Sequence, residues 1–299
     1  MPKGRTKRWK TSAVKDGIVT LTISSWKYFS DLVSQELAEF TTYIFRGHES
    51  DGWTLQPSLF RLFETSKPKN VTAARILHLE NFKTAVRGRR GSNPPEMKTE
   101  NEWWALGQHN GLATPLLDWT DSPFVALYFA FEEERIGSDD HRVVYCLSEA
   151  DVRRKVWELE TEYNKKKTEY DKIYAELNPP YQLLGSLMPK KPDVKLPPLP
   201  QEPDLLEIVR PMTDENVRLV SQRGLFVRIP DNLTLENWIE KHFEGEDNSY
   251  FLIKVKIPNR GRESCIRMLN RMNINHLSLF PDLFGAGKYC NLDLQIKNY

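Results

Sequence analysis

The sequence predicts an α+β fold, in which a single mixed or antiparallel sheet forms the core and helices surround it. Short segments with alternating apolar residues, such as residues 18–23, lie between longer segments whose apolar residues recur every three or four positions. The strand-like segments in the last third of the chain, residues 205–210, 219–229 and 251–257, are too few for a second sheet of normal size. We therefore expect one domain over residues 18–299.

Composition and charge limit the classes of protein. Hydrophobic residues make up 39% of the 299 residues, which is enough for a sizeable core. The net charge of +1 predicts a weak overall attraction to nucleic acids and anionic membranes. No segment approaches the roughly 20 apolar residues of a membrane span, so we expect a cytoplasmic protein without a membrane partner. The three cysteines lack metal-ligand spacing, so we expect neither a disulfide framework nor a metal site.

The N-terminal part begins with basic residues and continues with strands and helices. Residues 1–17 contain clustered Lys and Arg without apolar periodicity, which predicts a flexible basic tail. We expect a strand at residues 18–23, a helix with one apolar stripe at residues 26–40 and a second strand at residues 43–45. A longer helix is expected at residues 71–86, where the arginines that follow suit a helix C-terminus.

Residues 101–130 are the most unusual stretch, because polar residues interrupt an apolar sequence. We expect, in order, a helix that includes Gln108, a turn at Asn110 and Gly111, a short strand near Leu116, a polar elbow from Asp118 to Ser122, and a helix from Pro123. Ser122 before a proline fits a helix N-cap with proline at the first helical position. The elbow thus lies at a helix N-terminus, where backbone N–H groups favour an anion.

Residues 149–204 are expected to form an insertion in the domain. A strand at residues 142–147 is followed by a helix at residues 149–177 that is polar nearly all round, and such a helix packs poorly into a core. Eight of the 19 prolines then lie between residues 179 and 203, which predicts an extended, polyproline-like segment. A helix at residues 259–272 and a compact segment with turns complete the chain.

Arg46 ends a strand-like segment, where a permanent positive charge needs a partner. Its guanidinium can form two parallel hydrogen bonds to a carboxylate or a phosphate, which indicates a role in holding an anionic ligand. Gly47 would allow a ligand or another part of the backbone to approach closely. The alternative is an internal salt bridge from Arg46 to Asp118 or Glu49.

A second group of candidate residues surrounds the polar elbow. Two tryptophans, Trp104 and Trp119, would form flat walls for a planar ring. The polar members of the group are Gln108, His109, Asp118, Thr120, Asp121 and Ser122. The alternatives are structural: Asp118 and Ser122 would satisfy backbone groups, and His109 would be either a general base or a packing residue.

Two later segments offer further candidates. In "VSQRGLFVR", residues 220–228, the glycine indicates a bulge or a ligand close to the backbone. Gln222 in the same segment can position a ligand, but its neutral side chain cannot act as an acid or a base. Asp282 lies in "HLSLFPDLFG", where an Asx-turn is the default explanation.

The chain contains "YIFRG", "WWALGQHNGLATPLLDWTDSPFVALYFA", "SQRGLF" and "LSLFPDLFGA", in this order. Together these motifs resemble the FRG domain, a family of mostly bacterial and phage proteins named for the motif present here as Phe45, Arg46 and Gly47. The resemblance extends from about residue 18 to residue 289 and omits the charged helix and the proline run. The function of this family is poorly defined.

A more distant resemblance is to the arginine-type ADP-ribosyltransferases, which adds a split sheet as an alternative form of the core. These enzymes carry an Arg on an early strand, a Ser-Thr-Ser strand followed by a helix with Ala-x-x-Phe-Ala, and a Glu on a later strand. Arg46 matches the first, Asp118-Trp119-Thr120 stands at the second, and "ALYFA" matches the helix. The Glu has no clean counterpart, because Glu215 lies too early and Gln222 is not a carboxylate.

This second resemblance implies that the chain binds NAD. Arg46 would hold the pyrophosphate, Thr120 and Ser122 the ribose or a phosphate, and Trp119 or Tyr128 would stack on the nicotinamide. Gly47 and His109 complete the cofactor-binding set that the resemblance implies. A carboxylate would stabilise the positive charge that develops when the glycosidic bond breaks. The catalytic candidates are Asp118, Glu215 and Asp282, together with Gln222 near the family's Glu position.

Three functions are therefore open. The first is an NAD-dependent ADP-ribosyltransferase-like toxin or phage-defence effector, with a nucleic-acid or protein acceptor and an antitoxin or other regulator as partners. The second is a non-catalytic module that binds a phosphorylated ligand or nucleotide through Arg46. The third is a metal-dependent nuclease built on Asp118, Asp121 and Asp282, whose spacing matches no known pattern.

Overall fold

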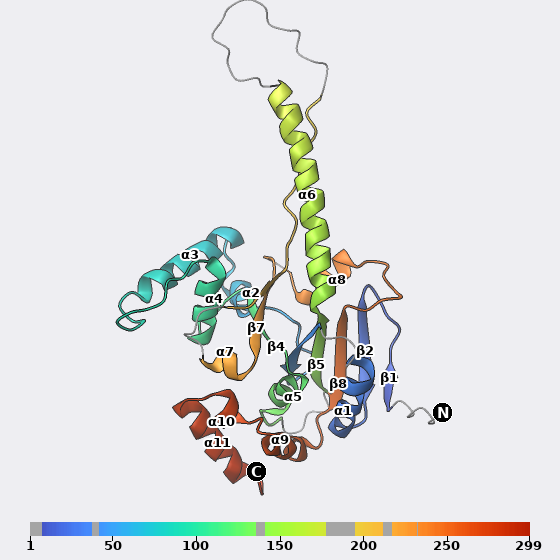
Figure 1. Ribbon diagram of the computed structural model, residues 1–299, viewed down its shortest axis with the longest axis vertical. Coiled ribbons are helices and arrows are strands. Elements are labelled where there is room, and N and C mark those ends of the chain that lie inside the picture. Colours follow the sequence, from blue (N-terminus) through green and yellow to red (C-terminus); the bar gives the residue numbers. More distant parts are fainter. Residues whose placement is uncertain (1–7, 38–41, 136–140, 178–194, 212–216, 232) are drawn as a thin grey trace, which may run out of the picture.

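The computed structural model describes residues 8–37, 42–135, 141–177, 195–211, 217–231 and 233–299. Within these residues one sheet of eight strands forms the centre of the molecule, in the order β1-β2-β8-β5-β3-β4-β7-β6 (Figure 1). The strands are β1 (Trp9–Thr11), β2 (Ile18–Ile23), β3 (Tyr43–His48), β4 (Leu116–Thr120), β5 (His141–Ser148), β6 (Glu207–Val209), β7 (Gly224–Arg228) and β8 (Leu252–Pro258). Strands β2 and β8 run parallel, and the other neighbours are antiparallel. The prediction of an α+β fold with a single mixed sheet is confirmed.

Helices cover both faces of the sheet, because its central strands carry apolar residues on both sides. In β5, Val143 and Tyr145 pack into one core, whereas Val144 and Cys146 pack into the other. The first core includes α2 (Ser58–Ser66), α3 (Val71–Ala85), α4 (Glu100–His109) and α8 (Leu235–His242). The second includes α1 (Phe29–Leu32), α5 (Pro123–Phe131), α9 (Arg262–Arg271), α10 (His276–Leu279) and α11 (Leu283–Gln295).

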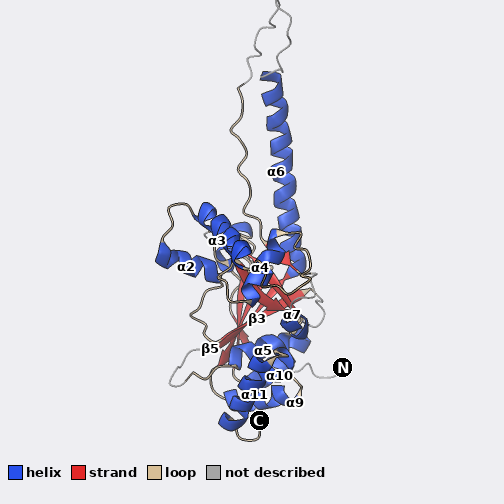
Figure 2. Ribbon diagram, turned by 90° about the vertical axis from the view of Figure 1, so that its left-hand side faces the viewer, coloured by secondary structure: helices blue, strands red, loops and turns tan. Residues whose placement is uncertain are grey.

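Helix α6 (Glu149–Leu177) projects away from the sheet (Figures 1 and 2). Its 29 residues correspond to about 44 Å at 1.5 Å per residue. Val152, near its start, is its buried residue. Residues 195–204 return alongside the helix towards β6 (Figure 2). The helix has the predicted bounds; the assignment of residues 149–204 as an insertion stays a prediction, and residues 178–194 lie outside the described part of the chain.

The N-terminal segment differs from the prediction in two places. Trp9–Thr11 form β1 on the edge of the sheet, and the Trp9 side chain packs into the second core, because burial of the large indole ring is favourable. The flexible-tail prediction is therefore wrong for these residues, and residues 1–7 lie outside the described ranges. The single helix expected at residues 26–40 is instead a 3₁₀ turn at Trp26–Tyr28, then α1, then a π-helical turn at Val33–Leu37.

The strand predicted at residues 219–229 is wrong in its first half. Residues Val217–Ser221 form α7, and β7 begins only at Gly224. The N–H groups of Gln222 and Arg223 donate to carbonyls of α7, so the chain completes a helical turn before it enters the sheet. Arg223 has φ of 47°, a left-handed conformation that reverses the direction of the chain.

The predicted polar elbow is also partly wrong, because Asp118 and Thr120 belong to β4. Both pair with β7, Asp118 with Phe226 and Thr120 with Gly224. Backbone pairing tolerates the polar side chains here because the Asp118 side chain remains exposed and the hydroxyl of the buried Thr120 is hydrogen-bonded. The helix start is as predicted: Ser122 Oγ accepts a hydrogen bond from the Val125 N–H at 3.4 Å, and proline occupies the first turn of α5.

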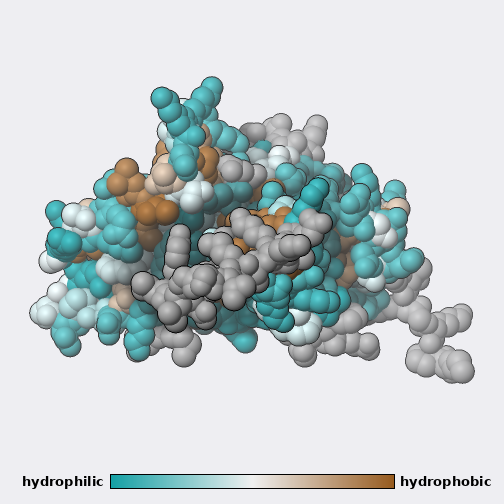
Figure 3. All heavy atoms as spheres, turned by 90° about the horizontal axis from the view of Figure 1, so that it is seen from above, coloured by the Kyte–Doolittle hydropathy of each residue, from teal (hydrophilic) through white to brown (hydrophobic). Residues whose placement is uncertain are grey.

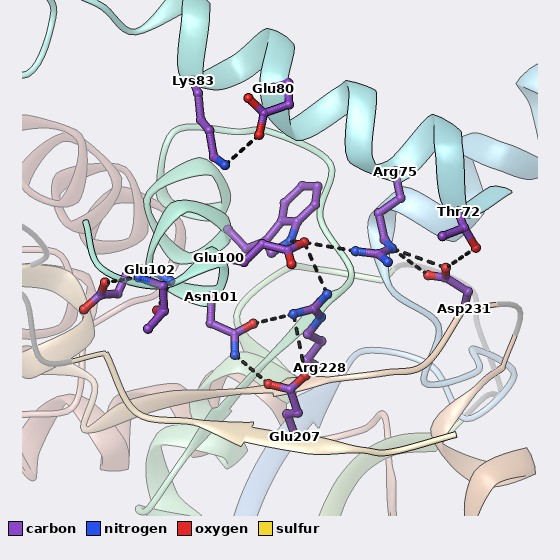
Figure 4. Close-up of polar contacts among 12 residues, drawn as sticks. Thr72, Arg75, Glu80, Lys83, Glu100, Asn101, Glu102, Glu207, Arg228 and Asp231 are labelled. Carbon is purple, nitrogen blue, oxygen red and sulfur yellow. Dashed lines mark hydrogen bonds and ion pairs between the residues drawn. The ribbon is translucent and has the colours of Figure 1, made fainter. Parts of the chain in front are cut away.

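Charged residues connect α3 and α4 to the β6–β7 edge of the sheet (Figure 4). Arg228 on β7 and Arg75 on α3 both contact the Glu100 carboxylate at the start of α4, at 3.3 and 3.0 Å. The side chains of both arginines are largely buried, so these pairs contribute more than exposed pairs do. Further members of the network are Asn101, Glu207 and Asp231. The network fixes the start of α4 and thereby places its last turn, which carries Gln108 and His109.

The surface is mostly hydrophilic in the view from the projecting end, with apolar patches between polar residues (Figure 3). None of the helices in the described ranges combines the length and the apolar character that crossing a membrane requires.

Candidate functional site

The sheet opens between two neighbouring strands, β3 and β4. Strand β3 pairs with β5 along its whole length, and β4 pairs with β7 along its whole length. Between β3 and β4, the register contains one pair, Phe45 with Thr120. The eight described strands thus form one sheet rather than two, but the strands diverge at this junction. The opening is where a split of the sheet would begin.

A pocket of about 390 Å³ lies in this opening, and we call it the fork pocket. It is lined by Phe45, Arg46, Gly47, Glu49, Gln108, His109, Asp118, Trp119, Thr120, Phe129, Glu132, Arg218, Leu219, Gln222, Phe226 and Phe280. Aromatic rings and charged groups of both signs therefore face one space. Such a mixture is typical of a pocket that binds an organic ligand with a few polar groups.

Arg46 bridges the two diverging strands. Its Nη1 donates a hydrogen bond to the main-chain carbonyl of Asp118 at 2.5 Å and lies 3.7 Å from the Asp118 carboxylate. Its Nε donates to Nε2 of His48 at 3.0 Å. The internal salt bridge from Arg46 to Asp118, one of the two interpretations of Arg46, is therefore present. The Arg46 side chain thus links β3 to β4 by a hydrogen bond, where other neighbouring strands are linked by backbone pairing.

His48 holds the Arg46 guanidinium in place and stays neutral. The His48 ring is 8% exposed. Burial, reinforced by the charges of Arg46 and Lys254, lowers the pKa of His48 to about 3. A neutral ring can accept the hydrogen bond from Arg46 through Nε2, whereas a protonated ring cannot. Burial also lowers the pKa of Arg46, and the nearby Asp118 carboxylate opposes this effect.

The Asp118 carboxylate is oriented from helix α4. Nε2 of Gln108 donates to Asp118 Oδ2 at 2.9 Å, and the amide oxygen of Gln108 accepts from the hydroxyl of Thr114. The Asp118 side chain is 61% exposed, so its carboxylate is accessible to a ligand in the fork pocket. His109, the next residue of α4, also lines the pocket, and burial and the charge of Arg218 lower its pKa.

Thr120 and Gln222 are linked to each other within the protein. The Thr120 hydroxyl donates to the main-chain carbonyl of Gln222 at 2.7 Å and accepts from the Ser122 N–H at 3.0 Å. Nε2 of Gln222 donates to the carbonyl of Leu279 at 3.2 Å. Thr120 is buried, and its bond to the Gln222 carbonyl connects β4 to the turn before β7. Its hydroxyl therefore shapes the wall of the fork pocket, whereas the sequence had indicated direct contact with a ribose or a phosphate.

Gly47 is required by the packing of β3 against α5. A β-carbon at this position would lie 2.0 Å from the carbonyl oxygen of Ala126 and 2.6 Å from the nitrogen of Ala130. Backbone atoms of a helix cannot move aside as a flexible side chain can. The close approach that the sequence indicated is thus made by the α5 backbone.

Several predicted residues of the described ranges do not line the fork pocket, among them the buried Trp104 and the ion-paired Asp121. Tyr128 is fully buried in the second core and shares a hydrogen bond with Nδ1 of His276, so it cannot stack on a ring in the pocket. Ser122 acts as the N-cap of α5. Asp282 is the N-cap of α11, where the Gly285 N–H and then Arg218 lower its pKa. Glu215 lies outside the described residues.

The structure adds Glu49 as a candidate functional residue, which the sequence indicated only as an ion-pair partner of Arg46. Glu49 follows β3 and lines the fork pocket, and its carboxylate has no hydrogen bond or ion pair with the described residues. Burial raises its pKa; the charge of Arg142 opposes this effect, and the charges of Glu133 and Glu132 add to it. Glu132 itself lines the pocket, 2.8 Å from Nε2 of His276. No local motif identifies Glu49 or Glu132. Each directly follows an element, β3 or α5, and the packing of these two elements brings both residues to the pocket.

The acidic residues of the proposed nuclease do not converge. Asp121 pairs with Arg210 at 3.0 Å, and Asp282 pairs with Arg218. Within the described ranges, no group of three or more His, Cys, Asp or Glu side chains is arranged to hold a metal ion.

Residues 41–139 match the family model of the FRG domain. Neither the curated proteins nor the solved structures contain a match to this chain. The matched segment contains β3, α2 to α5 and β4, and so it supplies Arg46, Glu49, Gln108, His109 and Asp118. The opposite wall of the fork pocket, with Arg218, Gln222 and Phe280, comes from residues beyond the matched segment.

Proposed function

We propose that this protein is an NAD-dependent ADP-ribosyltransferase-like enzyme and that the fork pocket binds NAD. The observation that supports this proposal is the meeting of Arg46 with two accessible carboxylates, those of Asp118 and Glu49, in one pocket with aromatic walls. NAD carries a pyrophosphate, a planar nicotinamide ring and a ribose that becomes positively charged when the ring leaves. Each of these features has a complementary group in the fork pocket.

Arg46 is the residue that we expect to hold the pyrophosphate. Its Nε and Nη1 are bonded to His48 and Asp118, and its remaining nitrogen, Nη2, has no partner among the described residues. These bonds fix the plane of the guanidinium before a ligand arrives, which lowers the entropic cost of binding. The rings of Trp119, Phe129 and Phe280 offer apolar surfaces for the nicotinamide or the adenine.

The carboxylates of Asp118 and Glu49 would act in different steps of the transfer. The bond between the nicotinamide nitrogen and the ribose carbon breaks, and its electron pair leaves with nicotinamide. Asp118, oriented by Gln108, stabilises the positive charge on the ribose, and a preorganised group of this kind contributes about 3 kcal/mol. An oxygen or nitrogen of the acceptor then bonds to the ribose carbon and releases a proton. Glu49 accepts this proton, because its raised pKa makes it the stronger base.

A specific observation favours a second candidate, a binding module without catalysis. Gln222, a neutral residue, stands in the fork pocket near the position where the transferases carry their Glu, and the Thr120 hydroxyl is already bonded to the main chain. In this alternative, Arg46 holds a nucleotide or another phosphorylated ligand, and Asp118 serves only to orient Arg46.

NAD consumption by the purified protein, with cell lysate as the source of acceptors, tests both candidates. We expect Asp118→Asn and Glu49→Gln to lower NAD loss about 100-fold, and the matched control Glu160→Gln, an exposed residue of α6, to leave it unchanged. No NAD loss, together with a melting temperature that rises on addition of NAD, would establish the binding module. No NAD loss and no thermal shift would contradict both candidates.

The acceptor and the partners form part of the same proposal. We propose that the acceptor is a protein or a nucleic acid, that the activity serves a toxin or phage-defence role, and that an antitoxin or other regulator controls it. The exposed α6 supports a regulator contact, because it projects beyond both cores (Figure 2). Incubation of the purified protein with lysate and with NAD labelled in its adenylate phosphate tests the class of the acceptor. Label in the protein fraction or in the nucleic-acid fraction identifies its class, and absence of label in both would contradict the transfer step.

A further inference from the structure

A second pocket, of about 530 Å³, lies at the start of α9. We call it the arginine pocket, because its charged residues are Arg135, Arg142, Arg262 and Arg267, with Glu134 and Glu263. Four cations thus face two anions, and the other lining residues are polar or glycine. Among the described residues, no aromatic or aliphatic side chain lines it. A pocket of this composition suits a small anion and offers no surface for a planar ring.

Arg142 provides the first indication of a ligand. It comes from β5 and is fully buried, with its guanidinium 5.1 Å from the Phe131 ring. Nε donates to Oδ1 of Asn259 and Nη1 donates to the carbonyl of Ala130, both at 2.7 Å. Nη2 is buried and has no hydrogen-bond partner among the described residues. A buried guanidinium N–H without a partner is costly, so its presence at the wall of a pocket points to an anion that completes the set.

The N-terminus of α9 provides the second indication. This helix has ten residues, and its N-cap is Gly261, which has no side chain that could cap the first turn. The N–H groups of Arg262, Glu263 and Ser264 have no acceptor within the helix, and these three residues line the arginine pocket. The positive end of the helix dipole therefore faces the same space as Arg142.

The remaining arginines have different roles. Arg262 donates to the main-chain carbonyls of Phe131 and Glu132, and Arg135 donates to the carbonyl of Glu49, so both contribute charge from fixed positions. Arg267 lies one turn along α9, and its Nε is buried without a hydrogen-bond partner in the described ranges. Its Nη2 is 3.8 Å from Glu263, too long for a hydrogen bond.

We propose that the arginine pocket binds the phosphate group of a small phosphorylated molecule. Arg142 and Arg267 contact the phosphate oxygens through their unpaired N–H groups, and the N–H groups of the first turn of α9 contact the others. This combination of guanidinium forks and backbone N–H groups is the one that proteins use for dianionic phosphate. The site is separate from the fork pocket and does not depend on the function proposed for that pocket.

Titration of the full chain with inorganic phosphate, followed by calorimetry and by melting temperature, tests this proposal. We expect saturable binding that Arg267→Ala weakens at least tenfold. The matched control is Arg271→Ala, which removes an exposed arginine from the last turn of the same helix and leaves the affinity unchanged. Arg46→Ala in the fork pocket also leaves it unchanged. Arg142→Gln abolishes binding if the variant folds, and Arg267→Ala carries the test if it does not.

Three results would overturn the proposal. The first is an equal thermal shift with chloride at the same ionic strength, which would indicate screening of charge. The second is loss of phosphate binding in Arg46→Ala with retention in Arg267→Ala, which would place the anion in the fork pocket. The third is binding of a short single-stranded DNA that depends on Arg267 when inorganic phosphate does not bind, which would assign the surface to a nucleic-acid backbone.

Discussion

The fork pocket and the arginine pocket are neighbours with different chemistry. Each contains an arginine from a central strand that donates to a main-chain carbonyl, Arg46 to Asp118 in one and Arg142 to Ala130 in the other. Aromatic rings and accessible carboxylates line the pocket at Arg46, whereas charged and polar groups line the pocket at Arg142. A hydrogen bond links residues of the two pockets: Arg135 of the arginine pocket donates to the main-chain carbonyl of Glu49 at 2.7 Å. The comparison teaches that the surroundings of an arginine decide whether it can serve a reaction or only hold charge.

The largest expected effect compares one glycine from each pocket. Gly47→Ala forces a β-carbon to within 2.0 Å of a helix carbonyl, so we expect a loss of about 4 kcal/mol or more in the free energy of unfolding. Gly261→Ala in the arginine pocket places alanine at φ of 86°, with the nearest atom 3.3 Å away, and we expect a loss of about 1 kcal/mol. Urea denaturation measures both. Equal losses would contradict the close packing of β3 against α5.

The next effect concerns the pH dependence of His48, which supports Arg46 of the fork pocket through a hydrogen bond. Its pKa falls from 6.5 in the unfolded chain to about 3 in the folded protein. The unfolded chain therefore binds a proton that the folded protein does not, and stability is lost as the pH falls through this range. Between about pH 7 and about pH 4, the His48 contribution is at most about 3 kcal/mol.

His48→Gln tests this effect, because glutamine can still accept the hydrogen bond from Arg46 but does not titrate. We expect the unfolding free energy of the variant to decrease less than that of the wild type as the pH is lowered. His109→Gln is the comparison variant, since the His109 ring lines the fork pocket without a bond to Arg46, and its lowered pKa predicts a smaller change in the same direction. Parallel pH profiles for His48→Gln and the wild type would contradict the neutral state of His48.

A smaller effect concerns the salt-bridge network that holds α4, a helix that lines the fork pocket but not the arginine pocket. Arg228→Ala removes the centre of the network in Figure 4 and leaves Glu100 with fewer partners, so we expect a loss of about 2 kcal/mol. Arg153→Ala, on the exposed surface of α6, should cost less than about 0.5 kcal/mol. Because α4 supports only the fork pocket, phosphate binding at the arginine pocket should persist in Arg228→Ala. Loss of phosphate binding in a folded variant would contradict this separation.

The smallest effect comes from Glu49, the residue between the pockets. Its raised pKa means that ionisation is less favourable in the folded protein, so its contribution to stability is lost as the pH rises through the folded pKa. Glu49→Gln removes this loss. We expect the variant to gain melting temperature over the wild type at about pH 7.5 and to gain little at about pH 4. A gain that is the same at both pH values would show that the effect is not due to ionisation.

Much of the fold follows from local patterns in the sequence. The bounds of β2 and α6, the start of α5 and its Ser122 cap were predictable, because periodicity and capping depend on neighbouring residues. The candidate site was predictable in part: Arg46, Gln108, His109, Asp118 and Trp119 do line one pocket. The errors share a cause. Tyr128 and Asp282 carry functional groups whose partners, His276 and Arg218, lie far away in the sequence.

The sequence by itself determined the α+β class, several helices, among them α3, α5 and α6, and the order of the motifs, because these depend on interactions within about a dozen residues. Only the tertiary structure decided that β3 and β4 diverge, that Arg46 bridges them, and that Glu49 joins Asp118 in the fork pocket. It alone also brought Arg142 of β5 to the start of α9. Both pockets are made by segments distant in the chain, and burial changes the chemistry of their charged groups only after those segments have met.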